Sequence, residues 1–313
     1  MKIAFHCNQL GVAGTEVATF DYAFFNQQML GNESIIISKL NPKHDYPLIL
    51  DKFKKHFKVI QYNDFKEVEK ILDDNKVDIF YALKSGEHDG VISKGRKSCI
   101  HVVFKAFQPH GRVYAYISNW LSKEASFGLH PWVPHMINLP DHNEDMRQDL
   151  NIPKDAMVYG RYGSYNEFNL WFVNNSIKKI LNKNKNVWFL FANTPRFHEH
   201  ENIIYLDPIY DIGEKVKFIN TCDAMIHARS RGETFGIACG EFSSKNKPVI
   251  TYGASPEKAH IDMLGTKGLY YYGEGDLDFL FNNFVKDDDK DWDAYSDRYN
   301  PRRVMEKFKQ VFL

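Results

Sequence analysis

Hydrophobic positions along the chain fall into short runs of β-branched and aromatic residues. These runs alternate with longer segments in which apolar side chains recur every three or four positions. The short runs predict strands and the longer segments predict helices, because these are the side-chain periods of the two structures. Alternation of the two is typical of βαβ units built around a parallel sheet. The pattern therefore predicts an α/β fold throughout.

In the first half of the chain the short runs predict seven strands, enough for one complete open sheet. They occupy positions 2–7, 34–38, 57–61, 77–83, 98–104, 113–118 and 132–137. The helical period covers positions 15–30, 64–75 and 119–127. We expect these segments to be crossover helices between parallel strands.

The alternation stops at 138–154, where two prolines flank a run of charged residues, and then starts again. Further strands are predicted at 157–160, 187–191, 203–206, 224–228, 248–251 and 269–272. Further helices are predicted at 166–182, 212–221, 236–245, 276–285 and 301–312. We therefore expect two Rossmann-like, doubly wound domains that face each other across a cleft, with ligands at the carboxyl ends of both sheets.

Composition supports a folded, two-domain protein. The 313 residues are 43% hydrophobic and 26% charged, unlike a disordered chain. Forty Lys and Arg balance forty Asp and Glu, so no net positive field attracts nucleic acid. An anionic ligand must therefore be bound by local groups.

The four cysteines form no CxxC pair, which favours reduced thiols in a cytoplasmic protein. The N-terminus lacks the apolar core of a signal peptide, and no apolar run approaches the ~20 residues that span a bilayer. We expect a cytoplasmic protein.

A glycine-containing loop, GVAGTE at 11–16, follows the first predicted strand and opens the first helix. Backbone N–H groups at such a helix start favour an anion, although a tight turn that uses glycine for positive φ explains the loop equally well. The spacing is not GxGxxG, and the second strand ends without an acidic residue for a ribose. A nicotinamide dinucleotide is therefore not expected.

The most informative stretch is ARSRGETFGIACGE at 228–241. It ends a buried strand, crosses a loop with Arg229 and Arg231, and begins a helix at about Gly236. The amides of Phe235, Gly236 and Ile237 would then suit a diphosphate.

Two glutamates, Glu233 and Glu241, lie eight positions apart in this stretch. In a continuous helix they would be about 12 Å apart, comparable to the distance from the sugar to the ribose of a nucleotide-sugar. Carboxylates accept hydrogen bonds from hydroxyls, so each could hold one end of such a ligand. The alternative is a pair of solvated glutamates on a surface helix.

At these residues the chain resembles the retaining GT-B glycosyltransferases of glycosyltransferase family four. That family has a Glu-x7-Glu motif in an E-x-F-G context followed by a Pro-Val-Ile strand, which corresponds here to 233–241 and 248–250. The glycine loop at 14–16, the Gly-Arg pair at 160–161 and the Ser-Asn pair at 118–119 resemble the family in the same order. The resemblance covers nearly the whole chain.

The resemblance implies an enzyme that moves a sugar from a UDP- or GDP-sugar to a hydroxyl of a glycan or glycoconjugate, with retention and without a metal or other cofactor. It implies an acceptor-side domain at 1–140, a nucleotide-sugar domain at 141–300, and a C-terminal helix at 301–313 that packs back on the first domain. Two alternatives stay open: a GT-B nucleotide-sugar epimerase, and a non-catalytic nucleotide-sugar or glycan-binding subunit.

Roles for single residues follow from the same resemblance. It assigns Glu233 to the donor sugar, Glu241 to the ribose and Arg161 to the diphosphate. It also brings Gly14 and Thr15 near the sugar-phosphate junction.

The family lysine five or six positions after Arg161 is missing, because Asn166 and Glu167 stand there. Arg229, Arg231 or Arg196 could replace it, or the diphosphate is bound differently.

His101 interrupts an apolar predicted strand, at a position where the family often has a histidine near the donor sugar. The resemblance makes it a candidate for sugar contact or acceptor positioning, and the alternative is a hydrogen-bonded core histidine. His110 and His6 are weaker candidates.

Three other signals favour simple explanations. The acidic run at 287–293 has DxD spacing, but we interpret it as a solvated linker. We interpret the HxH sequence at 198–200 as part of a loop. The basic and aromatic segment 52–58 reads as a solvated helix face, while peripheral membrane contact has no further support. No metal site is expected.

Overall fold

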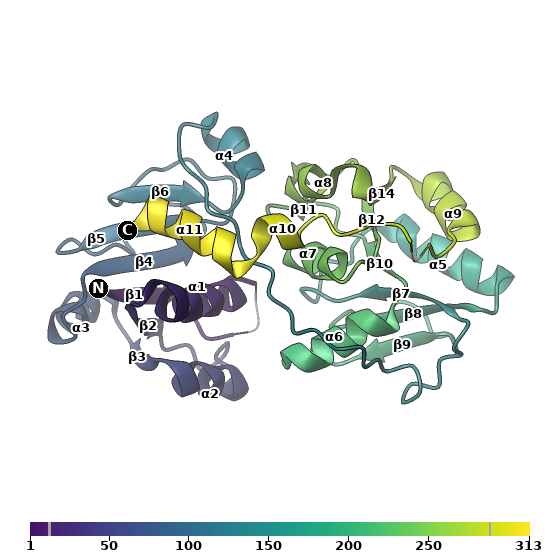
Figure 1. Cartoon of the computed structure of the whole chain (residues 1–313), viewed down its shortest axis with the longest axis horizontal. Coiled ribbons are helices and arrows are strands. Elements are labelled where there is room, and N and C mark those ends of the chain that lie inside the picture. The colour runs from purple at the N-terminus through teal and green to yellow at the C-terminus, as the bar shows by residue number, and fades with distance from the viewer. Residues whose placement is uncertain (12–13, 288) are drawn as a thin grey trace. The chain divides into compact units, whose positions relative to one another are not determined.

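The computed structural model describes residues 1–11, 14–287 and 289–313. The chain divides into two compact units, unit 1 (residues 1–136 and 299–313) and unit 2 (residues 137–298). Each unit contains a six-stranded sheet, and the strand pairs of both sheets are parallel (Figure 1). The predicted α/β class is confirmed.

The sheet of unit 1 has the strand order β3-β2-β1-β4-β5-β6, which is the order of doubly wound nucleotide-binding folds. Its strands are β1 (Lys2–Cys7), β2 (Glu33–Lys39), β3 (Lys58–Tyr62), β4 (Ile79–Lys84), β5 (Lys97–Val102) and β6 (Val113–Tyr116). Its helices are α1 (Gly14–Leu30), α2 (Pro47–His56), η1 (Phe65–Glu67), α3 (Val68–Asp74), α4 (Asn119–Ser126) and α11 (Pro301–Phe312). The short helix α10 (Ser296–Tyr299) crosses the boundary between the two units.

The C-terminal helix α11 packs on unit 1 beside α1, as expected (Figure 1). Its apolar face is buried because aromatic rings meet there: Phe308 stacks on Tyr22 at 5.4 Å, and Phe312 meets Tyr81 edge-on at 5.3 Å. Such aromatic pairs stabilise a core beyond the area they bury. The last residues of the chain therefore complete the core formed by the first.

The sheet of unit 2 has the order β14-β12-β10-β7-β8-β9, which repeats the topology of unit 1 when counted from β7. Its strands are β7 (Met157–Arg161), β8 (Val187–Ala192), β9 (Ile203–Leu206), β10 (Ala224–His227), β12 (Val249–Tyr252) and β14 (Gly268–Tyr271). A separate short pair joins β11 (Gly232–Glu233) to β13 (Glu257–Lys258). Its helices are α5 (Trp171–Lys183), α6 (Ile212–Thr221), α7 (Ile237–Ser244), α8 (Ala259–Leu264), η2 (Gly265–Lys267) and α9 (Glu274–Asn283).

The prediction of a strand at 132–137 is wrong. Trp132 makes one isolated bridge to Tyr116, and the rest of the segment is irregular. Pro131 and Pro134 explain this, because proline has no N–H to donate to a neighbouring strand. The segment is still buried at Val133, which is why its apolar pattern imitates a strand.

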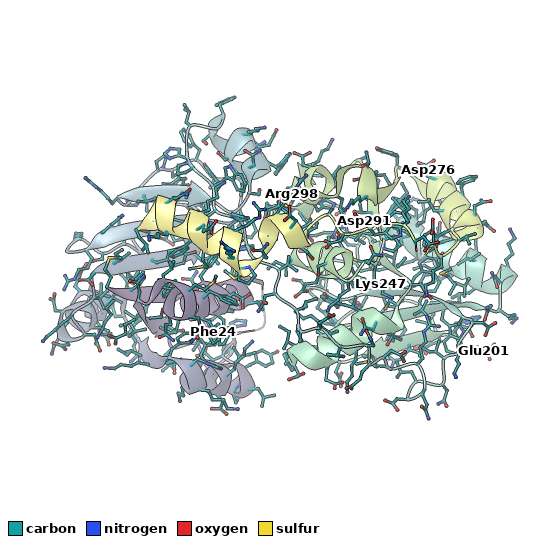
Figure 2. All side chains as sticks on the ribbon, viewed as in Figure 1. Phe24, Glu201, Lys247, Asp276, Asp291 and Arg298 are labelled. Atoms are coloured by element: carbon teal, nitrogen blue, oxygen red, sulfur yellow. The ribbon has the colours of Figure 1, made fainter. Side chains whose placement is uncertain are left out.

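The basic and aromatic segment at 52–58 belongs in part to α2. Phe53 is buried with its ring 5.2 Å from that of Phe20 on α1, while Lys52 covers the same Phe20 ring. Phe24, also on α1 (labelled in Figure 2), meets the ring of His56 edge-on at 5.4 Å. The aromatic residues of this segment therefore join α2 to α1.

Among the described residues, no helix combines the length and apolar character needed to cross a bilayer. All four cysteines are free and buried. Burial raises the pKa of Cys7, Cys99, Cys222 and Cys239, so these thiols are unreactive at neutral pH.

Candidate functional site

Three neighbouring strands of unit 2 bring the candidate residues to one edge of its sheet. β7 ends at Arg161 and β10 ends at His227, which pairs in register with Thr251 on β12. The loop after β10 carries Arg229 and leads to Glu233 on β11. Because the strands are parallel, their carboxyl ends share this edge, where ligands of open α/β sheets bind.

The Glu233 carboxylate is held on both oxygens. Oε1 lies 3.2 Å from Nε2 of His227, and Oε2 accepts a hydrogen bond of 2.8 Å from Nη1 of Arg229. Its side chain is 24% exposed, so Glu233 is not sealed in the core.

Burial acts to raise the pKa of Glu233, but the hydrogen bond from His227 and the positive charge of Arg229 outweigh it. The pKa falls to about 2. Glu233 is therefore an ionised hydrogen-bond acceptor at neutral pH.

Arg229 lies between two carboxylates. Its Nε donates to Oε2 of Glu167 at 2.7 Å, and its Nη1 donates to Glu233. Burial alone would lower the pKa of Arg229, but Glu233 and Glu167 raise it above its ordinary value. Glu167 stands at one of the two positions where the resemblance led us to expect a lysine. In the structure this glutamate pairs with Arg229 instead.

Arg161 is buried at the end of β7. Its guanidinium donates to the Asn193 carbonyl at 3.0 Å, the Thr194 hydroxyl at 2.6 Å and the Ser164 carbonyl at 2.7 Å. Burial lowers the pKa of Arg161 to about 10, while Glu233 and Glu167 oppose the shift. It therefore stays charged beside the Glu233–Arg229–Glu167 group.

The other two candidate arginines each pair with a different carboxylate. Arg231 donates to Glu257 at 2.8 Å with a side chain 52% exposed. Arg196 pairs with Glu199 in the loop before β9. Of the three arginines that the sequence left as alternatives, Arg229 is the one in contact with Glu233.

The helix α7 begins at Ile237 after Gly236, which has φ of 86°. The positive φ favours glycine at this position, and a Cβ would crowd its neighbours, at 3.0 Å from Cβ of His260 and 3.3 Å from Cβ of Glu233. Phe235 is buried in the core of unit 2, whereas Ile237 is partly exposed. Because the segment from Glu233 to Gly236 is not helical, the separation expected for a continuous helix does not apply.

Glu241 lies on α7 and is buried. Its Oε2 accepts from the Tyr162 hydroxyl at 2.6 Å, and its Oε1 accepts from Nζ of Lys215 at 2.8 Å. The two partners are the residue that follows β7 and a residue of α6, so contacts from outside α7 fix the direction of this carboxylate.

His101 lies inside the sheet of unit 1 with no exposed surface. Nδ1 is 2.6 Å from the Tyr81 hydroxyl and Nε2 is 2.8 Å from the Val133 carbonyl oxygen, so both nitrogens have protein partners. Burial lowers the pKa of His101 to about 3. This geometry favours the core alternative over sugar contact.

The two weaker histidine candidates differ. His6 is buried with Nε2 2.7 Å from the Tyr62 hydroxyl. His110 is held through Nδ1 by the carbonyl of Gln108 in a loop.

The glycine loop of unit 1 is described in part, because Val12 and Ala13 lie outside the described residues. Gly14 is exposed at the start of α1. Thr15 donates through Oγ1 to Oε2 of Glu16 at 2.7 Å, and burial raises the pKa of that glutamate.

Sequence reasoning missed His227, Thr251 and His260. His227 ends an apolar strand, as His101 nearly does. It stands directly before the stretch at 228–241 and is not part of that motif. Its partner Thr251 is 24 positions further along the chain, and only strand register brings the two together.

Within residues 1–11, 14–287 and 289–313, no group of three or more His, Cys, Asp and Glu side chains is arranged to hold a metal ion. Of the acidic run, Asp291 pairs with Lys267, and Asp288 is outside the described residues. His198 and His200 lie in the loop before β9.

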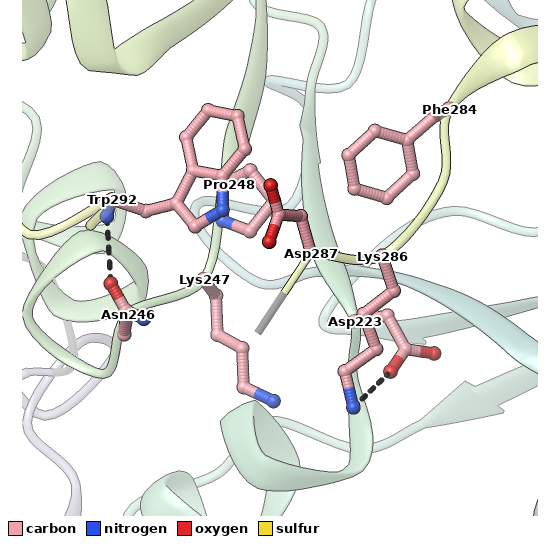
Figure 3. A pocket seen from close by; sticks show the side chains of 8 residues that line it. All are labelled: Asp223, Asn246, Lys247, Pro248, Phe284, Lys286, Asp287 and Trp292. Atoms are coloured by element: carbon pink, nitrogen blue, oxygen red, sulfur yellow. Dashed lines mark hydrogen bonds and ion pairs between the residues drawn. The ribbon is translucent and has the colours of Figure 1, made fainter. Parts of the chain in front are cut away.

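A small pocket lies at the opposite edge of the unit 2 sheet, beside the residues that precede β10 and β12 (Figure 3). The ammonium groups of Lys247 and Lys286 point into it, and Lys286 is 3.8 Å from Asp223. Its volume of about 30 Å³ admits water but not a nucleotide. None of its lining residues belongs to the candidate site.

No protein-family model matches this chain, and no curated protein sequence does. Solved structures share its fold. HepE (Alr3699) of Anabaena, solved with UDP-glucose, has a TM-score of 0.75 and 13% identity, covering 99% of each chain. A glycosyltransferase of Rickettsia africae ESF-5 has a TM-score of 0.72 and 13% identity, covering 99% of this chain and 97% of that chain.

A third structure belongs to a Listeria monocytogenes protein provisionally assigned as a UDP-N-acetylglucosamine 2-epimerase. It has a TM-score of 0.64 and 11% identity, and the match covers 99% of this chain and 96% of that chain. At these identities the likeness shows the fold alone. The fold is GT-B, as the sequence predicted.

Proposed function

We propose that this chain is a glycosyltransferase that moves a sugar from a nucleotide diphosphate sugar to a hydroxyl of a glycan or glycoconjugate, with retention of the anomeric configuration. The observation that carries the proposal is the ionised Glu233 carboxylate, held by His227 and Arg229 at the carboxyl edge of the unit 2 sheet. HepE, which shares the fold, was solved with UDP-glucose, so uridine nucleotides are the first donors to test.

In this proposal Glu233 binds hydroxyls of the donor sugar. A carboxylate has about four lone-pair positions, and His227 and Arg229 take two of them. In this proposal the other positions accept hydrogen bonds from the sugar hydroxyls. Because Glu233 stays ionised at neutral pH, these bonds are charge-assisted and strong.

Arg229 and Arg161 provide positive charge for the diphosphate. Charge builds up on the leaving diphosphate in the transition state, so preorganised cations at this position accelerate transfer. Arg229 replaces the lysine that the resemblance led us to expect. Glu241 binds the ribose, and unit 1 recognises the acceptor.

The test begins with the intact chain and three donors: UDP-glucose, UDP-N-acetylglucosamine and GDP-mannose. A bound donor raises the melting temperature by mass action, so one donor should give a clear, concentration-dependent shift. The same donor, offered with a panel of glycan acceptors, should release nucleotide diphosphate and yield a product whose anomeric configuration is read by NMR. Absence of both binding and transfer with a broad donor panel counts against the proposal.

The likeness to the Listeria protein favours one second candidate, a nucleotide-sugar epimerase. An epimerase would convert the donor without an acceptor. Incubation with UDP-N-acetylglucosamine alone, followed by NMR of the sugar, separates the two functions.

A further inference from the structure

A row of hydrogen bonds starts at Oε1 of Glu233, the carboxylate oxygen that Arg229 does not bind. His227 touches Glu233 through Nε2 and, through Nδ1, lies 2.8 Å from the Thr251 hydroxyl. That hydroxyl lies 3.0 Å from Nε2 of His260. Thr251 and His260 have no exposed surface, and His227 is almost fully buried.

Three separate elements build this row of hydrogen bonds. His227 and Thr251 are register partners on β10 and β12, which places their side chains next to each other on one face of the sheet. His260 comes from α8, with its ring centre 5.0 Å from that of His227. A surface glutamate needs no such support, so a buried row of hydrogen bonds that ends on one carboxylate requires an explanation.

The donor and acceptor capacities of these side chains show which atoms carry the protons in this row of hydrogen bonds. An ionised carboxylate only accepts, so His227 must carry its proton on Nε2 and donate it to Glu233. Thr251 has one hydroxyl proton, so it donates to one histidine and accepts from the other. The orientation of the His227 ring thus depends on Thr251, and the orientation of Glu233 depends on His227.

We propose that Thr251 and His227 are positioning residues for the donor sugar, with His260 as their buried support: together they fix the Glu233 carboxylate in the orientation that receives the sugar hydroxyls. This inference rests on the proposed function. It assigns to these three hydrogen-bonded residues a part in sugar recognition that is distinct from binding of the nucleotide.

The first experiment needs no substrate. Histidine nitrogens labelled with ¹⁵N report which ring atom carries a proton, and wild type should show His227 protonated on Nε2. Thr251→Val removes the hydroxyl with little change of shape and should shift the Nδ1 signal of His227, whereas Thr251→Ser should keep the wild-type signal. An unprotonated Nε2 in wild type, or an unchanged Nδ1 signal in Thr251→Val, overturns the inference.

The second experiment separates positioning from simple stability. Thr251→Val should lower kcat/KM for the nucleotide-sugar about tenfold while leaving the affinity for free UDP within twofold, and Thr251→Ser should restore turnover. The matched control is Thr221→Val, because Thr221 is a buried threonine of unit 2 whose hydroxyl bonds to backbone groups at Lys217 and Met146. It should lower the melting temperature without a kinetic effect.

The outcomes are distinct. If Thr251→Val weakens UDP and nucleotide-sugar equally, or behaves like Thr221→Val, the residue is merely structural and the inference fails. If wild type binds and transfers no sugar, the proposed function fails and takes the sugar-recognition role with it. The nitrogen spectra of the unliganded protein then still decide whether the row of hydrogen bonds exists.

Discussion

Two buried histidines near strand ends, one in each unit, show how different partners give similar residues different roles. His101 on β5 contacts the Tyr81 hydroxyl and the Val133 carbonyl, both neutral. His227 on β10 contacts the Thr251 hydroxyl and the Glu233 carboxylate. Both units have the same strand order, so the sheet topology does not explain the difference.

The difference lies in charge and access. Burial lowers the pKa of His101 to about 3, so it is neutral and serves the core of unit 1. His227 instead supports a carboxylate whose pKa is lowered to about 2 and whose side chain is partly exposed. A buried histidine is thus a stronger indication of a functional site when it is hydrogen-bonded to a partly exposed charged group than when its partners are neutral and buried.

The largest expected effect comes from removing that charge. Glu233→Gln keeps the shape but replaces the ionised acceptor, and hydrogen bonds to charged groups contribute roughly 1.5–3 kcal/mol. We expect kcat/KM for the nucleotide-sugar to fall on the order of 100-fold, with free UDP affinity less affected. Steady-state kinetics and UDP titration measure the two. Wild-type turnover in this variant would remove Glu233 from the site.

The next effect concerns the cation beside Glu233. Arg229→Met should weaken UDP binding about tenfold, because a charge-assisted contact to the diphosphate is lost. Arg231→Met is the matched control, since Arg231 comes from the same loop but pairs with Glu257. Calorimetric titration of UDP compares them. Equal losses in both variants would mean that the loop, rather than Arg229, matters.

Substitution of His101 should lower stability and leave activity unchanged, in contrast to the two substitutions above. His101→Phe leaves the Tyr81 hydroxyl and the Val133 carbonyl without this partner, which costs roughly 1–3 kcal/mol of unfolding free energy. Chemical denaturation should show that loss, while kcat/KM of the folded protein stays within twofold of wild type. A large kinetic defect at wild-type stability would restore His101 as a site residue.

Acid should destabilise the protein through its buried histidines. The pKa values of His6, His101 and His260 are lowered to about 3, chiefly by burial, from an ordinary value of 6.5. Below pH 6.5 the unfolded chain therefore binds protons that the folded chain does not, so stability falls between pH 6.5 and 3. Below pH 4.5 protonation of Glu233 in the unfolded state adds to the loss, down to about pH 2.

Melting curves from pH 7.5 to 5 test this, because the Glu233 contribution lies below that range. His6→Phe and His260→Phe should each make the dependence shallower. A flat curve for wild type would show that these histidines become protonated without unfolding.

The smallest effect is expected from metal removal. If Arg161 and Arg229 neutralise the diphosphate, EDTA should leave sugar transfer within experimental error of the untreated enzyme. Magnesium or manganese added back is the control. A loss with EDTA that manganese restores would show that these arginines are insufficient.

The sequence predicted most of the fold because hydrophobic periodicity is a local property. β7 and β9 lie within one residue of their predicted bounds, and α11 begins at the predicted proline. The pattern misled at 132–137, where prolines interrupt a buried segment. It also left α2 incompletely recognised, because the burial of Phe53 against α1 cannot be seen from the segment itself.

The candidate site divides in the same way. Glu233, Arg229 and Gly236 could be named in advance, because they stand within eight positions of one another in a motif. The choice of Arg229 over Arg231 and Arg196 came from its contact with Glu233.

By itself, the amino-acid sequence determined the fold class, the two-fold repetition of the sheet and the glutamates to examine. Only the tertiary structure decided which histidine supports a charge. His227, Thr251 and His260 meet because two strands pair in register and a helix covers them, and such contacts depend on distance in space rather than along the chain. Hydrogen bonds and ion pairs form only between atoms a few ångströms apart, so the roles of these polar residues are set by packing that no local pattern encodes.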